Sequence, residues 1–145
     1  MRVVAMLVLL LVLAGGIGAS YVIYRLMETK TVALAAGAAW VNQPDGSRCL
    51  IARFDIESRT NGVWYLDAPE DVSVSGTVAV IGSADKDVGL RVYSPVNRAV
   101  YRTQGRTHEA SFQFVAEVRG DYRFEIDNRH SAFAAKDVTL SVCES

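Results

Sequence analysis

The chain has 145 residues, of which 50% are hydrophobic and 21% are charged, and its formal net charge is −1. This composition is far from that of a disordered chain, and the lack of a basic excess disfavours non-specific nucleic-acid binding. Two cysteines and two histidines exclude a zinc finger or an iron–sulfur scaffold made by this chain alone, so we expect no cofactor.

An uncharged apolar segment, residues 3–24, opens the sequence. As a helix it would be about 33 Å long, which is enough to cross a hydrocarbon core of about 30 Å. Two tyrosines near its end are typical of a membrane interface. We therefore predict a transmembrane anchor over residues 1–25, a linker over residues 26–48 and a folded domain over residues 49–145.

A cleaved signal peptide is the alternative interpretation of this segment, with a small-residue cleavage region at residues 14–19. Apolar character resumes beyond that region, at residues 21–24, and this favours a retained anchor. The small residues also pair at a spacing of four, which would let another membrane helix approach closely. This predicted helix-packing strip consists of Ala14, Gly15, Gly18 and Ala19.

The orientation of the anchor is weakly encoded, because Lys and Arg flank the segment on both sides. The order of charges and apolar residues resembles that of an export signal. We therefore predict a cytoplasmic N-terminus and an extracytoplasmic C-terminal domain, in a periplasm or a lumen. The expected partners are the lipid bilayer and other membrane proteins, which would contact the helix and the surface of the domain.

The predicted linker combines two different patterns. Residues 31–41 are rich in alanine and either continue a helix or run extended, although Gly37 disfavours the helix by about 1 kcal/mol relative to alanine. Residues 42–47 (NQPDGS) are a strong turn signal. Trp40, just before that turn, either marks the membrane interface or covers the core of the following domain, and we favour the core.

Alternation of apolar and polar residues with a period of two dominates from Cys49 onward. The alternating runs cover residues 50–57, 63–66, 72–81, 88–93, 99–102, 109–118, 122–127 and 137–142. Turn signals rich in Gly, Pro, Asn and Asp separate these runs. Strands with one apolar face must hide it against another such face, so we predict an all-β fold: an antiparallel, jelly-roll-like β-sandwich of about eight strands.

The two cysteines occupy the first and the last predicted strand of the domain. Cys49 and Cys143 both have the parity of the outward-facing polar residues. Because terminal strands of sandwiches often lie near each other, a Cys49–Cys143 disulfide is one prediction, and two unrelated thiols are the alternative. The bridge would close a loop of about 95 residues, contribute roughly 4–5 kcal/mol and require an oxidising compartment.

Local candidates for nucleophilic catalysis are two His–Ser pairs, His108 with Ser111 and His130 with Ser131. Neither pair lies in a strand–turn–helix elbow, and no Gly-x-Ser-x-Gly motif, P-loop or dinucleotide fingerprint occurs. Exposed loop histidines are therefore the favoured interpretation, and we expect a protein that is not an enzyme.

Two further sets of charged residues have alternative interpretations. Loop carboxylates could supply oxygen ligands for calcium, but their spacing does not match an EF-hand, which favours solvated side chains. These carboxylates are Asp67, Glu70, Asp71, Asp85 and Asp87. Several arginines could bind an anionic surface, but interspersed acids favour ordinary surface residues. These arginines are Arg91, Arg98, Arg102 and Arg106.

The sequence of residues 120–142, GDYRFEIDNRHSAFAAKDVTLSV, has a recognisable order of glycine, aromatic, apolar strand, Asp-Asn, serine and lysine. The residues in this order are Gly120, Tyr122, Phe124, Asp127, Asn128, Ser131 and Lys136. The pattern resembles the closing segment of the GOLD (Golgi-dynamics) domain, and residues 110–118 look similar to the strand before it. The resemblance implies a β-sandwich of the kind found in cargo receptors of the early secretory pathway and in some lipid-transfer proteins.

The residues of this motif have a structural interpretation. Gly120 permits a tight turn, and Asp127 and Asn128 can bond the backbone as the chain leaves a strand. Lys136 would anchor the following loop to a carboxylate or a carbonyl. The position of Cys49 resembles the first cysteine of the receptor branch, whose second cysteine would fall within residues 124–126. We interpret the motif as fold-defining rather than as a ligand site.

These observations lead to one functional prediction and one alternative. The prediction is a non-enzymatic, single-pass membrane protein whose extracytoplasmic sandwich mediates protein–protein interaction, as an accessory or stabilising subunit of a membrane complex. The alternative is a secreted or surface-displayed module that binds lipid or glycan or adapts cargo.

Overall fold

The computed structural model describes residues 29–31, 39–81, 87–131 and 134–145, and these residues form ten strands and no helix. The strands are β1 (Thr29–Thr31), β2 (Val41–Asn42), β3 (Arg48–Ile56), β4 (Asn61–Ala68), β5 (Val72–Ile81), β6 (Gly89–Tyr93), β7 (Ala99–Arg102), β8 (Glu109–Ala116), β9 (Gly120–Asp127) and β10 (Lys136–Glu144). All eight predicted runs are strands, so the all-β prediction is confirmed. The predicted anchor and its helix-packing strip lie outside the described residues, and no helix within the described part is long and apolar enough to cross a membrane.

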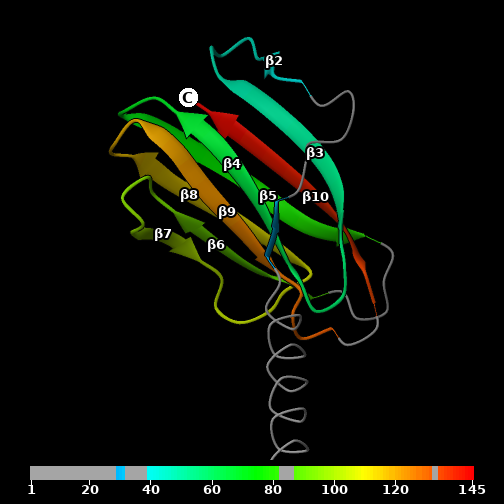
Figure 1. Cartoon of the computed structure of the whole chain (residues 1–145). Coiled ribbons are helices and arrows are strands. Elements are labelled where there is room, and N and C mark those ends of the chain that lie inside the picture. Colours follow the sequence, from blue (N-terminus) through cyan, green and yellow to red (C-terminus); the bar gives the residue numbers. More distant parts are fainter. Residues whose placement is uncertain (1–28, 32–38, 82–86, 132–133) are drawn as a thin grey trace, which may run out of the picture.

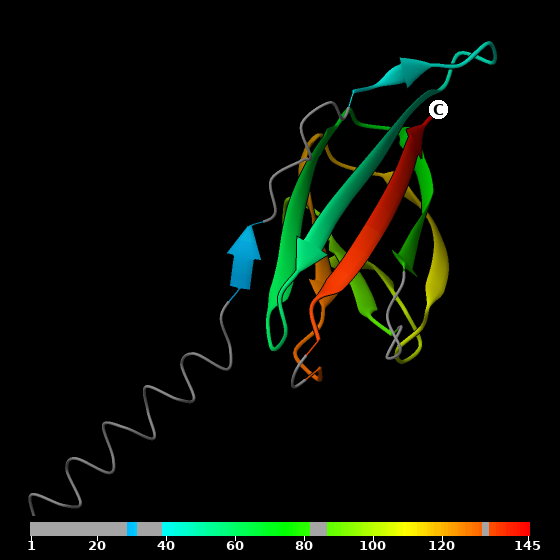
Figure 2. The ribbon, with the colours of Figure 1, turned by 90° about the vertical axis from the view of Figure 1, so that its right-hand side faces the viewer.

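Two five-stranded sheets pack face to face (Figures 1 and 2). Sheet A has the order β1-β4-β9-β6-β7, and sheet B has the order β2-β3-β10-β5-β8. From β3 to β10, every connection passes from one sheet to the other except the β6–β7 hairpin. Neighbouring strands are antiparallel apart from the short parallel pair β1–β4, which confirms the predicted antiparallel sandwich.

The predicted linker contributes two short strands to the sheets. β1 adds an edge to sheet A beside β4, and β2 pairs with the beginning of β3. Strands of two or three residues are too short to show a period, which is why the sequence did not reveal them. The Ala-rich stretch begins and ends in these strands, and its residues 32–38 lie outside the described part of the chain.

The core lies between the sheets, where the apolar faces of the alternating strands meet. Five aromatic side chains form its centre, and Phe124 contacts both Trp64 and Phe112, with ring centroids 5.1 and 5.5 Å apart. Phe114 stacks on Tyr122 at 5.3 Å. Offset and tilted ring pairs at these distances are favourable beyond their area of burial, so β4, β8 and β9 are held together across the sandwich.

Gly76 in β5 occupies an inward position where a side chain does not fit. A Cβ there would overlap the carbonyl oxygen of Ser141 and lie 2.6 Å from the ring of Phe112. We expect Gly76→Ala to lower the free energy of unfolding by about 2–3 kcal/mol, measured by urea denaturation, because the strand or the ring must shift. Gly89→Ala is the control, since its Cβ would lie 3.6 Å from Asp127, an ordinary contact; equal losses in both variants would contradict the prediction.

Candidate functional site

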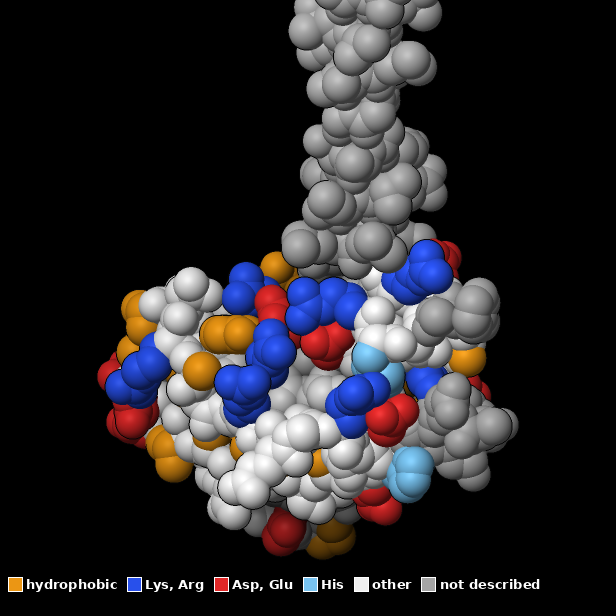
Figure 3. Space-filling view, turned by 90° about the horizontal axis from the view of Figure 1, so that it is seen from below, with side chains coloured by type: hydrophobic (Ala, Val, Ile, Leu, Met, Phe, Trp, Pro, Cys, Tyr) orange, Lys and Arg blue, Asp and Glu red, His pale blue; other side chains and the backbone are white. Residues whose placement is uncertain are grey.

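A pocket of about 500 Å³ opens at one end of sheet A. We name it the arginine pocket; it is lined by Gly89, Arg91, Arg102, Thr103, Gly105, Arg106, Asp127, Arg129 and His130. Figure 3 views the molecule from this end and shows Lys and Arg side chains gathered there, with acidic and histidine side chains among them. The lining therefore includes four arginines, Arg91, Arg102, Arg106 and Arg129.

The register of sheet A creates this pocket. In the β6–β9 pair, Gly89 lies opposite Asp127, and in the β6–β7 pair, Arg91 lies opposite Arg102. Glycine leaves the space beside Asp127 unfilled, while the next outward position on the same strand supplies an arginine. Residues from three strands thus surround a position without a side chain, which is the basis of the hollow.

The loop after β7 forms one wall of the pocket. Thr103 holds this loop against β6, because its hydroxyl accepts a hydrogen bond from the backbone N–H of Leu90 at 3.1 Å. The same hydroxyl donates a hydrogen bond to the carbonyl of Gly105 within the loop, at 2.9 Å. Gly105 has a φ of +83°, a conformation that favours glycine and lets the chain turn back. The turn places Arg106 at the rim, directly after Gly105.

Asp127 holds Arg129 rigidly at the second wall. Its carboxylate accepts the backbone N–H of Arg129 at 2.9 Å and two guanidinium N–H groups at 3.1 and 2.8 Å. Partial burial raises the pKa of Asp127, but the hydrogen bonds from Arg129 and the charges of Arg129 and Arg91 outweigh it, so this pKa lies below its usual value. The same hydrogen bonds raise the pKa of Arg129.

A second carboxylate, Asp87, supports the rim. His130 Nε2 lies 3.2 Å from one of its oxygens, and the guanidinium of Arg106 lies 3.6 Å from the other. Desolvation raises the pKa of Asp87. The hydrogen bond with His130 and the charges of His130, Arg106 and Lys136 together outweigh this effect, so the pKa lies below its usual value. Arg102, by contrast, makes no ion pair within the described part of the chain.

The depressed pKa of Asp127 has a consequence for stability. A carboxylate whose pKa is lower in the folded state stabilises the fold above its unfolded value, near 3.8, and loses this contribution as the pH falls through the folded value. We expect Asp127→Asn to lower the free energy of unfolding by about 1 kcal/mol at pH 7, and the difference from the native chain to shrink as the pH falls below about 3.8. The control is Asp121→Asn on the same strand; a deficit of Asp127→Asn that is independent of pH would contradict the expectation.

The predicted arginine set is divided by the fold. Arg91, Arg102 and Arg106 meet in the pocket, which the interpretation as ordinary surface residues did not anticipate. Arg98 lies elsewhere and pairs with Glu117, as that interpretation expects. The sequence also gave no sign of Arg129, which β9 delivers from a distant part of the chain.

The other candidates for chemistry are engaged in the local structure or are not brought together. The Ser131 hydroxyl donates to the carbonyl of Ala134 and accepts its N–H, while His130 contacts Asp87 instead. No group of three or more metal-ligating side chains occurs among the residues that the structure describes, and Asp85 lies outside them.

The first half of the predicted motif shapes the entry into β9. Gly120 has a φ of +137°, and a Cβ there would approach Pro95 to 3.1 Å. Tyr122 is buried, and its hydroxyl donates to the carbonyl of Val118 at 3.0 Å, which closes the β8–β9 turn. Phe124 follows in the centre of the core.

The second half of the motif fixes the loop between β9 and β10. Asn128 is fully buried, and its amide donates to the carbonyls of Ile56, Glu57 and Ala134 at 3.0–3.2 Å. Lys136, at the start of β10, is also fully buried. Asp127 therefore stands between the loop network and the arginine pocket.

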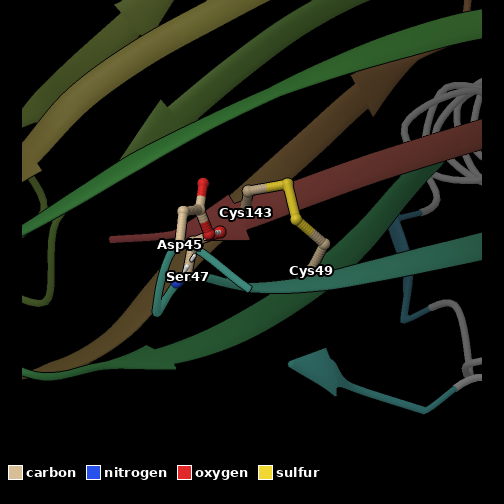
Figure 4. The surroundings of a disulfide bond; sticks show 4 residues. All are labelled: Asp45, Ser47, Cys49 and Cys143. Atoms are coloured by element: carbon tan, nitrogen blue, oxygen red, sulfur yellow. Dashed lines mark hydrogen bonds between the residues drawn. A yellow bond between two sulfur atoms is a disulfide. The ribbon is translucent and has the colours of Figure 1, made fainter. Parts of the chain in front are cut away.

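The cysteines are joined at the opposite end of the sandwich from the arginine pocket. Cys49 in β3 and Cys143 in β10 lie directly opposite each other and form a disulfide, with their Cα atoms 4.1 Å apart. Figure 4 shows the turn carrying Asp45 and Ser47 beside this bond. The Asp45 carboxylate accepts hydrogen bonds from the hydroxyl and the backbone N–H of Ser47, which close the turn.

The fold and the site define a disulfide-bridged β-sandwich domain with a cationic pocket at one end. The sequence model of the protein family described as "emp24/gp25L/p24 family/GOLD" matches residues 51–143. The chain therefore belongs to this family. This confirms the resemblance seen in residues 120–142. The receptor-type position of the second cysteine, within residues 124–126, lies in β9, whereas the partner of Cys49 here lies in β10.

Two solved structures are similar to this chain at low identity. PliG of Aeromonas hydrophila, a periplasmic inhibitor of g-type lysozyme, is 21% identical, with 82% of this chain and 97% of that chain covered and a TM-score of 0.48. A chain from the disulfide-linked pili that form Bacillus endospore appendages is 17% identical, with 78% and 95% covered and a TM-score of 0.47. No curated protein matches the chain.

Proposed function

We propose that the chain is a non-enzymatic, membrane-anchored interaction module whose GOLD-family sandwich lies outside the cytoplasm, as an accessory or stabilising subunit of a membrane protein complex. The Cys49–Cys143 disulfide carries this proposal. Disulfides form and persist in oxidising compartments and are rare in the cytosol. The apolar segment at residues 3–24 supplies both the export signal and the anchor that this location needs.

The position of β1 supports a close attachment to the membrane. Only the residues between Tyr24 and Thr29 separate the apolar segment from sheet A. At about 3.3–3.6 Å per residue, Thr29 lies within roughly 18 Å of the end of the apolar segment. A domain held this near the bilayer is suited to contacts with the extracytoplasmic parts of another membrane protein.

The local chemistry supports an interaction role over catalysis. Ser131, one of the sequence-level nucleophile candidates, uses its hydroxyl in a turn with Ala134. His130, its candidate base, is instead one of the groups that surround Asp87. The polar residues of the family motif thus serve the fold.

Native sizing of the full-length chain, extracted in mild detergent, tests the proposal. We expect it to migrate in a particle larger than its own micelle-bound monomer, together with a co-purifying membrane protein, and to resist extraction by alkaline carbonate. Thiol labelling should modify the cysteines only after reduction, with the Cys49→Ser/Cys143→Ser variant as the unlabelled control. A lone monomer, or thiols that are labelled without reduction, would overturn the proposal.

Sequencing the N-terminus of the mature protein separates this proposal from the alternative. A retained Met1 is expected for an anchored subunit. A mature terminus near Ser20 would instead indicate a released module that binds lipid or glycan or adapts cargo.

A further inference from the structure

We propose that the arginine pocket binds the phosphate group of an anionic phospholipid in the membrane that carries the anchor. This inference rests on the proposed membrane attachment and adds a ligand to it. The shared chemistry is that of a phosphate ester or a free phosphate, and the position of the pocket favours the lipid as its source.

The arginines of the pocket have more N–H donors than the neighbouring carboxylates accept. Arg129 is held by Asp127, to which its side chain donates two hydrogen bonds. Arg91 and Arg106 lie 3.8 and 3.6 Å from their carboxylates, longer than direct hydrogen bonds, and Arg102 makes no ion pair with any described residue. A guanidinium has five N–H donors in a planar fork that matches two oxygens of a phosphate. Three guanidiniums therefore retain donors for an anion.

The pocket is also positively charged, although the whole chain has a slight negative net charge. Its four arginines outnumber Asp127 and Asp87 by two, whereas the whole chain has a net charge of −1. All other residues together therefore carry an excess of three negative charges. Such a distribution attracts an anion at this one end and turns that end toward an anionic surface.

Sheet A places the pocket in the same row of paired residues as Thr29, the first residue of β1. Thr29, Asn61, Asp127 and Gly89 form one continuous row of paired residues across β1, β4, β9 and β6. At about 4.8 Å per strand, Gly89 lies roughly 14 Å from Thr29 along this row. Thr29 itself is within roughly 18 Å of the end of the apolar segment. The pocket is thus within reach of the headgroup region, on the end of the sandwich shown in Figure 3.

The dimensions of the pocket suit a headgroup rather than a flat contact. Its volume of about 500 Å³ is in the range of small-molecule sites. The missing side chain of Gly89 keeps it open, and the fixed pair of Asp127 and Arg129 gives it a rigid wall. A single phosphate would sit among Arg91, Arg102 and Arg106, with the glycerol moiety directed outward.

Titration of the full-length chain in uncharged detergent micelles tests the inference. Phosphatidylglycerol, phosphatidylcholine and inorganic phosphate are added separately at constant ionic strength, and binding is measured as the rise in the midpoint of thermal unfolding. We expect phosphatidylglycerol to raise the midpoint, phosphatidylcholine to leave it unchanged and inorganic phosphate to act only at much higher concentration.

Three variants locate the binding. Arg102→Gln/Arg106→Gln removes two exposed charges of the pocket and should weaken the apparent affinity for phosphatidylglycerol about tenfold. Gly89→Leu fills the pocket without changing any charge and should weaken it similarly. The matched control Arg53→Gln/Arg98→Gln removes two exposed arginines outside the pocket and should leave the affinity unchanged.

Several outcomes would overturn the inference. Equal losses in the pocket variants and the control would show general charge attraction, and equal responses to the two lipids would show no headgroup selectivity. Inorganic phosphate acting as strongly as phosphatidylglycerol would indicate a soluble ligand. Carbonate extraction reports separately on the anchor, so a chain that stays in the membrane but ignores phosphatidylglycerol refutes the pocket alone.

Discussion

Replacing both cysteines with serine is expected to lower the free energy of unfolding by about 4–5 kcal/mol. Cys49 and Cys143 are 94 residues apart in sequence, so their bond closes nearly the whole domain and restricts the unfolded chain strongly. The loss approaches the total stability of an ordinary domain. The urea-induced unfolding of the native and Cys49→Ser/Cys143→Ser chains, followed by tryptophan fluorescence, measures it.

The same experiment separates the covalent bond from the side chains. Reduction of the native chain should reproduce the loss in the serine variant, because both remove the same constraint. The Cys49→Ala/Cys143→Ala variant should behave like the serine variant, since both cysteines are only partly buried and no core contact depends on sulfur. An unchanged urea midpoint in the double variants would contradict the prediction and show that other contacts hold the start of β3 to the end of β10.

The strands were predictable because the pattern that defines a strand lies in residues that are adjacent in the sequence. In β3 and β10, successive residues face the core and the outer side in turn, so the period of two can be seen in consecutive residues of the sequence. The two cysteines shared the outward parity, and they became neighbours once β3 and β10 paired. The sequence could place them on terminal strands but could not state that these strands are adjacent.

The arginine pocket was not predictable because it depends on how strands that are distant in the sequence pair with each other. It depends on Gly89 lying opposite Asp127, and on Arg91 lying opposite Arg102, which are facts of register between strands. Counting acids along the sequence suggested that the arginines would be neutralised nearby. In the fold, Arg98 is indeed paired, whereas Arg102 meets no acidic partner in the described part of the chain.

The motif of residues 120–142 lies between these two cases. Its order of residue types identified the family, yet the reason for one of its members became clear only in three dimensions. Asn128 contacts the carbonyls of Ile56 and Glu57, more than 70 residues earlier, and that of Ala134 nearby. Sequence reasoning expected only local bonds where the chain leaves the strand. The residue instead joins the end of β9 to the end of β3, across the two sheets.

Asn128 should accordingly be among the least replaceable polar residues of the domain. Its two amide N–H groups serve three carbonyls, so one N–H is shared, and the side chain is fully buried. The reverse orientation of the amide would point its oxygen at three other oxygens, which fixes the assignment. Asn128→Ala removes every one of these bonds from a fully buried position. It leaves the carbonyl of Glu57 to the hydroxyl of Thr60 and that of Ala134 to the hydroxyl of Ser131, and we expect a loss of about 3 kcal/mol.

Asn128→Asp tests whether donation, rather than shape, is what the site requires. The substitution keeps the size of the side chain but directs a carboxylate at the carbonyls of Ile56, Glu57 and Ala134, so the loss at pH 7 should exceed that of Asn128→Ala. Because a buried carboxyl favours its neutral form, acidification should restore one donor and recover part of the stability. Urea denaturation at pH 7 and pH 5 measures both effects, with the exposed Asn42→Asp as a control that should change stability by less than about 0.5 kcal/mol. A milder loss for Asn128→Asp than for Asn128→Ala at pH 7 would show that the residue fills space and that its hydrogen bonds contribute little.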